Sequence, residues 1–117
     1  MKTEQIFMMV FRFTPNPNYQ PSAEERAEMK SQWGRFIGNL AISEKLVHTY
    51  QLGFEGKQVQ ADHSVNDGPV VADAQTLGGN LVLKAHSLEE ATELAKDCPI
   101  LHMGGSVEIR SIIPMAS

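Results

Sequence analysis

The sequence contains two histidines whose neighbours suit proton transfer. His48 and Tyr50 are alternate residues in an apolar segment, so they share one face if that segment is a strand. His63 lies four residues before Asp67, and a histidine beside a carboxylate can act as a general base. We therefore take His48, His63 and Asp67 as candidate catalytic residues. The alternatives are structural: the histidines are hydrogen-bonded packing residues, and Asp67 caps the turn made with Gly68-Pro69.

Three other side chains are candidates for binding a small ligand. Arg12 can bind a carboxylate through two hydrogen bonds, or it can pair with an acidic neighbour at the rim of a sheet. Trp33 can form an aromatic wall for a ring-shaped ligand, or it can be a core residue between a helix and the sheet. Tyr50 can anchor a ligand beside His48. We expect no metal site, because no His and Cys pair has zinc spacing, and no cofactor, because neither glycine pair opens a phosphate-binding loop.

Length and composition narrow the class of protein. The chain has 117 residues, enough for one buried core, and we expect a single domain over residues 1–117. Ten Lys and Arg against 14 Asp and Glu give a net charge of -4, which argues against nucleic acid as a partner. Cys98 is the only cysteine, so no internal disulfide forms and nothing indicates secretion. No segment approaches the roughly 20 apolar residues that span a bilayer. We expect a soluble, cytoplasmic protein that binds no membrane.

Apolar spacing predicts the elements that position these residues. Two serines, each followed three residues later by a glutamate, predict helices that begin after Ser22 and Ser87 and end near residues 41–43 and before Pro99. Gly34 and Gly38 in the first helix predict close packing there, because each lowers helix stability by roughly 1 kcal/mol. Apolar runs and alternation predict strands over residues 6–13, 46–52, 59–65, 77–85 and 107–113.

The order of these elements predicts an α+β fold. Treating the strand over 59–65 as a hairpin insert leaves strand, helix, strand, strand, helix, strand, the split βαβ pattern of the ferredoxin-like fold. Both helices then lie on one face of an antiparallel sheet. The first strand is nevertheless apolar on both faces, with Phe7, Met9, Phe11 and Phe13 on one side and Ile6, Met8 and Val10 on the other, so the uncovered face exposes apolar side chains. An exposed apolar patch of that kind marks an interface. We therefore expect a homodimer whose sheets face each other across a cleft.

The order and spacing of several short motifs resemble the DGPF branch of the YCII-related family. The resemblance covers nearly the whole chain and implies a ferredoxin-like dimeric α/β barrel. Most of that family has no established activity, while some relatives are dehalogenating or ring-modifying enzymes that use a His and Asp pair in the cleft. The motifs are Asp67-Gly68-Pro69, Leu77-Gly78-Gly79, residues 87–95, Pro99 and residues 105–110.

Two departures from the family pattern bear on function. Val70 stands where the family tetrad ends in Phe, and Trp33 stands where the catalytic relatives carry a histidine on the first helix. Tryptophan cannot shuttle a proton at neutral pH, so that role does not transfer to this chain. We therefore favour a homodimer that binds a small molecule. The alternatives are a cofactor-free enzyme, lyase or dehalogenase-like, that acts on a small cyclic or aromatic substrate through a His/Asp pair, and a regulatory or structural dimer without ligand.

Overall fold

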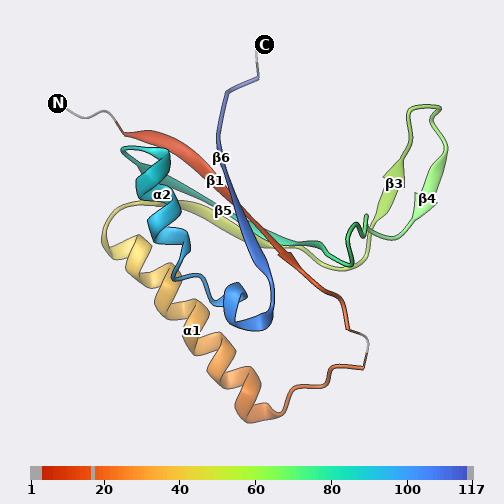
Figure 1. The fold of residues 1–117 in the computed structure, drawn as a ribbon, viewed down its shortest axis with the longest axis horizontal. Helices are drawn as coiled ribbons and strands as arrows, with labels where there is room; N and C mark the ends of the chain where they lie inside the picture. The colour runs from red at the N-terminus through yellow and green to blue at the C-terminus, as the bar shows by residue number, and fades with distance from the viewer. Residues whose placement is uncertain (1–3, 17, 116–117) are drawn as a thin grey trace.

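The structure is a computed structural model and describes residues 4–16 and 18–115. Four strands form an antiparallel sheet in the order β2-β5-β1-β6, and β3 and β4 form a separate two-stranded sheet (Figure 1). With α1 and α2 in the connections, this is the predicted ferredoxin-like α+β arrangement. The elements are β1 (Gln5–Phe13), α1 (Ala23–Ile42), β2 (Leu46–Gln51), β3 (Lys57–Val59), β4 (Val65–Asp67), β5 (Thr76–Ala85), α2 (Leu88–Ala95), the 3-10 helix η1 (Pro99–Met103) and β6 (Ser106–Ser111).

Alternate residues of the central strands point to opposite faces of the main sheet. Phe7, Met9 and Phe11 of β1 are buried and belong to the core that includes Phe36 and Leu40 of α1. The residues between them lie on the opposite face, which no described helix covers. We call this the open face. From the strand register it comprises Ile6, Met8, Val10, Arg12, His48, Tyr50, Asn80, Val82, Lys84, Ser106, Glu108 and Arg110.

Both helices begin where the serines predict. The Ser22 hydroxyl accepts a hydrogen bond from the Glu25 amide, and the Glu25 carboxylate accepts one from the Ser22 amide, which is a complete capping box. α2 ends at Ala95, and Pro99 then begins η1 instead of only stopping a helix. Proline suits this position because the first-turn amides of a helix have no partner within it. No described helix is long and apolar enough to cross a membrane.

The prediction of one half-buried strand over 59–65 is wrong. The segment is instead part of a hairpin in which β3 and β4 flank a turn, and the side chains of Val59 and Val65 are mostly exposed. The turn forms because the Asp62 carboxylate accepts hydrogen bonds from the amide and hydroxyl of Ser64, and His63 adopts a positive φ of 73°. Alternation of apolar residues continued across this turn and concealed it.

The prediction of close packing at Gly34 and Gly38 is also wrong. A Cβ added at either glycine would meet no described heavy atom within 4 Å. The reason is that α1 does not press the side that carries these glycines against the sheet. Only Phe36 and Leu40 of this helix are fully buried.

Candidate functional site

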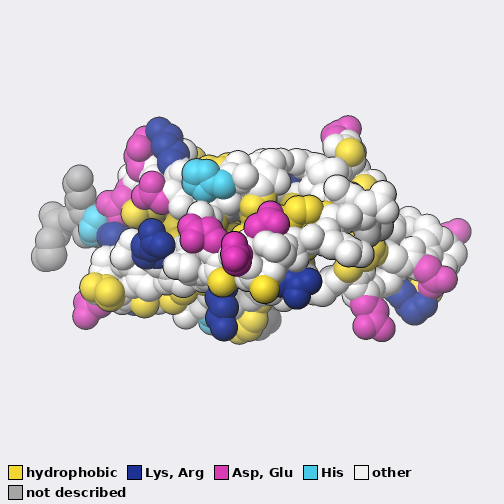
Figure 2. Space-filling model, turned by 90° about the horizontal axis from the view of Figure 1, so that it is seen from below, with side chains coloured by type: hydrophobic (Ala, Val, Ile, Leu, Met, Phe, Trp, Pro, Cys, Tyr) yellow, Lys and Arg dark blue, Asp and Glu magenta, His cyan; other side chains and the backbone are white. Residues whose placement is uncertain are grey.

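A pocket of about 620 Å³ lies between the N-terminal half of α1 and the helix-covered face of the sheet. Its wall is mostly apolar and aromatic. In the view from below, apolar side chains are visible over the middle of the molecule, with charged side chains around them (Figure 2). The apolar residues that line the pocket include Phe11, Phe13, Met29, Trp33, Ile37 and Ile100.

Trp33 and its neighbours determine the shape of this pocket. The Trp33 ring meets Phe11 edge to face, with ring centroids 5.3 Å apart, and meets Phe36 in the same manner at 6.1 Å. Gly34 follows Trp33 on α1 and also lines the pocket. Since there is open space where its Cβ would be, the missing side chain leaves that part of the pocket unfilled.

The polar groups of the pocket are suited to binding and not to proton transfer. Lys30 is the only charged residue among the described residues that line it, and none of these residues is a histidine, an aspartate or a glutamate. Gln51 adds an amide group. The Thr49 hydroxyl already donates a hydrogen bond to the Asn80 carbonyl at 2.8 Å. Among the residues that the structure describes, no cluster of three or more His, Cys, Asp or Glu side chains is arranged to hold a metal.

A second, smaller hollow lies between α1 and the segment from α2 to η1. Its volume is about 350 Å³, and its lining includes the exposed residues Arg35, Asp97 and His102. Ligand sites are usually concave and mostly apolar, with a few polar groups that orient the ligand. The larger pocket beneath α1 fits that description better.

The structure separates the predicted ligand-binding residues. Trp33 lines the pocket beneath α1. Tyr50 also borders that pocket, but the register places it on the open face with His48 and Arg12. Arg12 Nη1 donates to Glu108 Oε1 at 2.6 Å, and Arg110 Nε donates to Glu108 Oε2 at 2.7 Å. Hydrogen bonds from Arg110 and then Arg12 lower the pKa of Glu108. Arg12 therefore makes the ion pair at the rim of the sheet that was its structural alternative.

The three candidate catalytic residues do not meet within one chain. His48 lies on the open face beside Tyr50, with ring centroids 5.7 Å apart. His63 lies in the turn of the hairpin, and Asp67 in β4 accepts a hydrogen bond from Lys57 at 2.5 Å. The hairpin projects away from the main sheet (Figure 1). No hydrogen bond between described residues joins it to His48, so a His/Asp pair remains a prediction.

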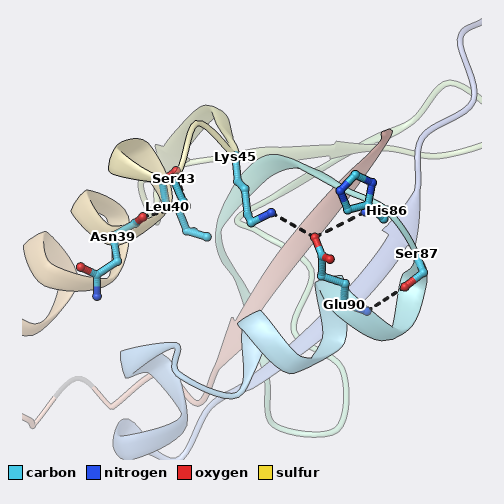
Figure 3. A network of polar contacts seen from close by, with 7 residues as sticks. All are labelled: Asn39, Leu40, Ser43, Lys45, His86, Ser87 and Glu90. Atoms are coloured by element: carbon cyan, nitrogen blue, oxygen red, sulfur yellow. Dashed lines mark hydrogen bonds and ion pairs between the residues drawn. The ribbon is translucent and has the colours of Figure 1, made fainter. Parts of the chain in front are cut away.

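A polar cluster that the sequence did not reveal joins the start of β2 to the start of α2 (Figure 3). Glu90 Oε1 accepts hydrogen bonds from Lys45 Nζ at 3.1 Å and from the His86 amide at 3.4 Å. The Lys45 hydrogen bond is the main reason that the pKa of Glu90 is lowered. Glu90 at the third position of a predicted helix was the available signal, but that spacing predicts a bond to the Ser87 amide and not to Lys45. The cluster joins two elements and faces neither pocket.

Cys98 is a core residue, as its position at the end of an apolar helical stripe indicates. Its side chain is completely buried, and burial raises the pKa of the thiol to about 11. The thiolate is the reactive form of cysteine, so this side chain is not a nucleophile at neutral pH.

Comparison with known proteins identifies the family of this chain. No curated protein matches the sequence. The model of the YCII-related domain matches residues 7–116, a span that begins in β1 and continues past β6. Since this match includes nearly the whole chain and both the pocket and the open face, the chain belongs to the YCII-related family.

Proposed function

We propose that this protein is a homodimer that binds a small cyclic or aromatic acid in the pocket beneath α1, without a reaction of its own. The main support for this proposal is the pocket. Its volume of about 620 Å³ falls within the range of about 300–1,000 Å³ that is typical of small-molecule sites. The site differs from a cleft between two facing sheets, because Trp33 and the phenylalanines of β1 lie on the helix-covered side.

The lining of the pocket indicates the class of ligand. Phe11, Phe13 and Trp33 present ring edges and faces, which favour a flat ring in offset or edge-to-face contact. Lys30 supplies a positive charge at the pocket, where an ammonium group can donate charge-assisted hydrogen bonds to a carboxylate. A small ring with one acidic group matches both features.

The open face supports the homodimer. Met8 and Val10 form a half-buried apolar centre on this face beside the buried Val82, and no described helix covers them. Surfaces of this kind on soluble proteins are usually interfaces. Two copies that pack these faces together at a sheet spacing of about 10 Å would cover the patch on both.

The fluorescence of Trp33 provides a direct test, because this is the only tryptophan of the chain and it lines the pocket. We would titrate the protein with a panel of small ring-bearing carboxylates, beginning with benzoate and salicylate. A ligand should change the fluorescence and raise the Tm, since binding to the folded state alone stabilises it. Gly34→Leu should abolish both responses and leave the protein folded, because the new side chain extends into open space at the pocket.

Gly38→Leu is the matched control. Gly38 lies four residues further along α1, also has open space around its Cβ position, and does not line this pocket. It should bind as the wild type does. Equal binding by wild type and Gly34→Leu would contradict the proposal. Binding that persists in Gly34→Leu and disappears in His48→Ala would instead locate the ligand on the open face.

The same panel separates the alternatives. Turnover of a halogenated or hydroxylated ring that disappears in His48→Ala would favour a cofactor-free enzyme. Within one chain the hairpin holds His63 and Asp67 away from His48, so that mechanism requires a second copy. No response to any ring-bearing acid would favour a regulatory or structural dimer.

A further inference from the structure

The β3–β4 hairpin carries an exposed pair of valines and, among the described residues, makes no hydrogen bond with the rest of the fold. All hydrogen bonds of residues 57–67 in the structure join residues 56–68 to one another. Val59 and Val65 lie opposite each other in the ladder, and their exposed fractions are 73% and 56%. A lone two-stranded hairpin is only marginally stable in water, so we expect this one to be stabilised by contact with another surface.

The charges of the hairpin complement those of the open face. Around the hairpin, Glu55, Asp62 and Asp67 outnumber Lys57, and Figure 2 shows acidic side chains gathered at that end of the molecule. The Ser64 hydroxyl and amide donate hydrogen bonds to Asp62 and lower its pKa, so this carboxylate is ionised at neutral pH. The hairpin region is therefore net acidic.

The open face has the opposite sign. Arg12, Lys84 and Arg110 outnumber its single carboxylate, Glu108, although the chain as a whole has a net charge of -4. Its apolar centre at Met8 and Val10 is half-buried in the single chain, so part of it is accessible to the exposed valine pair of a hairpin. Apolar patches beside charges of opposite sign make the two surfaces complementary.

The hairpin is also long enough to reach a second copy. Residues 57–60 lead from the base at Gly56 to the turn that begins at Ala61, and at a rise of about 3.3 Å per residue this span is roughly 16 Å. Packed sheets lie only about 10 Å apart. An arm of this length can cross from one sheet layer to the next.

We propose that the β3–β4 hairpin is an arm that packs against the open face of a second copy of this chain. In a two-fold symmetric dimer each copy gives one arm and receives one. This inference rests on the homodimer proposed above and adds the element that holds it together. It also carries His63 and Asp67 of one copy to the face that displays His48 of the other.

Measuring the affinity of the dimer tests whether the hairpin contributes to dimerisation. We would measure the Kd of dimerisation by sedimentation over a concentration series for wild type, for Val59→Lys/Val65→Lys, and for Ile42→Lys as the control. Lysine tolerates an exposed strand, but here it removes the apolar pair and cancels the acidity of the hairpin. We expect the double variant to raise the Kd at least tenfold. Ile42→Lys should leave it unchanged, because this 84% exposed residue ends α1, away from both surfaces.

Two further variants keep the test independent of hairpin folding. The Gly68 amide donates to the Gly56 carbonyl at 2.8 Å, so the ends of the hairpin are adjacent and two glycines can replace residues 57–67. This excision should raise the Kd as the lysines do and leave the circular dichroism of the main fold intact. Arg110→Glu in the wild-type background should also raise the Kd, because it removes the excess positive charge of the open face that would meet the acidic hairpin.

The outcomes are distinguishable. If wild type and the hairpin variants dimerise with equal affinity, the arm is wrong and the homodimer stands. If the wild type is a monomer at micromolar concentration, both the arm and the homodimer are wrong. Ligand binding at Trp33 is measured separately and is unaffected by either result.

Discussion

At the scale of single residues, carboxylates connect the elements of this fold. Glu90 joins Lys45, just before β2, to the first turn of α2, and Glu108 joins Arg12 of β1 to Arg110 of β6. Each has a lowered pKa because cationic side chains donate hydrogen bonds to it. Protonation of these groups therefore weakens contacts between elements that are distant in sequence.

Glu90→Gln should lower the free energy of unfolding at neutral pH. Because folding lowers the pKa of Glu90 below its ordinary value of 4.5, its stabilisation is present above that pH and is lost as the pH falls through the folded-state pKa. The side chains of Lys45 and Glu90 are 23% and 33% exposed, so solvent screening limits the effect to about 0.5–1 kcal/mol. Urea unfolding at pH 7 and at pH 3 measures it.

Glu89→Gln is the control for this prediction. Glu89 lies in the same first turn of α2 and shares the favourable interaction with the helix dipole, but no hydrogen bond joins its side chain to Lys45 in the structure. At pH 7, Glu89→Gln should lower the free energy of unfolding by less than Glu90→Gln does. If both variants lose the same free energy of unfolding at pH 7, or if the loss in Glu90→Gln persists at pH 3, the Lys45 contact does not stabilise the fold.

At the scale of elements, glycines mark where the chain is close-packed and where it is not. A Cβ at Gly105, just before β6, would collide with the carbonyl oxygen of Arg12 and with Ile100. A Cβ at Gly38 in α1 would meet no described atom within 4 Å. The junction of η1, β6 and β1 is thus tight, whereas one side of α1 is open.

The same substitution should therefore have opposite effects at these two positions. Gly105→Ala should lower the free energy of unfolding by about 1–3 kcal/mol, because backbone atoms must move to admit the methyl group. Gly38→Ala should raise it by up to about 1 kcal/mol, because alanine favours the helix. Chemical denaturation of both variants tests this contrast. A stabilising Gly105→Ala would mean that β6 does not pack against β1 as described.

At the scale of the whole molecule, the main sheet has one face that the helices cover and one face, the open face, that no described helix covers. Met9 is completely buried beneath the helices, whereas the adjacent Met8 is half-buried on the open face. These two adjacent residues of β1 therefore face different surroundings, one the core and the other the open face. Met9 supports the fold of a single chain, and Met8 belongs to the surface through which we propose that two chains associate.

Met8→Asp should yield a folded monomer, and Met9→Asp should not fold. A charge at Met8 remains in water in a single chain and lies beside Arg110 in the register, but it would be buried in a dimer of facing sheets. A charge at Met9 is buried in the core of each chain. Circular dichroism and light scattering would compare the two. A Met8→Asp protein that dimerises as the wild type does would contradict an interface on the open face.

Much of the fold could be predicted because its signals are local. The two serines with a glutamate three residues on marked the helix starts, since capping depends on neighbours in sequence. Apolar residues on both faces of β1 identified a central strand. The β3–β4 turn was missed because the alternation of valines continues through it, and η1 was missed because Pro99 was interpreted only as a stop.

The candidate site was harder to predict. Trp33 was expected in a cleft with Arg12, His48 and Tyr50, but it lines the pocket beneath α1, whereas the register places the other three on the open face. The pocket depends on the distance between α1 and the sheet at Gly34, and that distance follows from packing over the whole helix. The position of the hairpin likewise depends on contacts that no short segment contains.

The sequence by itself determined the order of the main-sheet strands and the two α-helices, the split βαβ pattern, the family and the apolar character of both faces of β1. It could do so because periodicity and capping act between near neighbours. Only the tertiary structure decided which face each candidate residue occupies, where the pocket lies and where the hairpin projects. Those features arise from contacts between residues distant in the chain, whose geometry is set when the elements pack together.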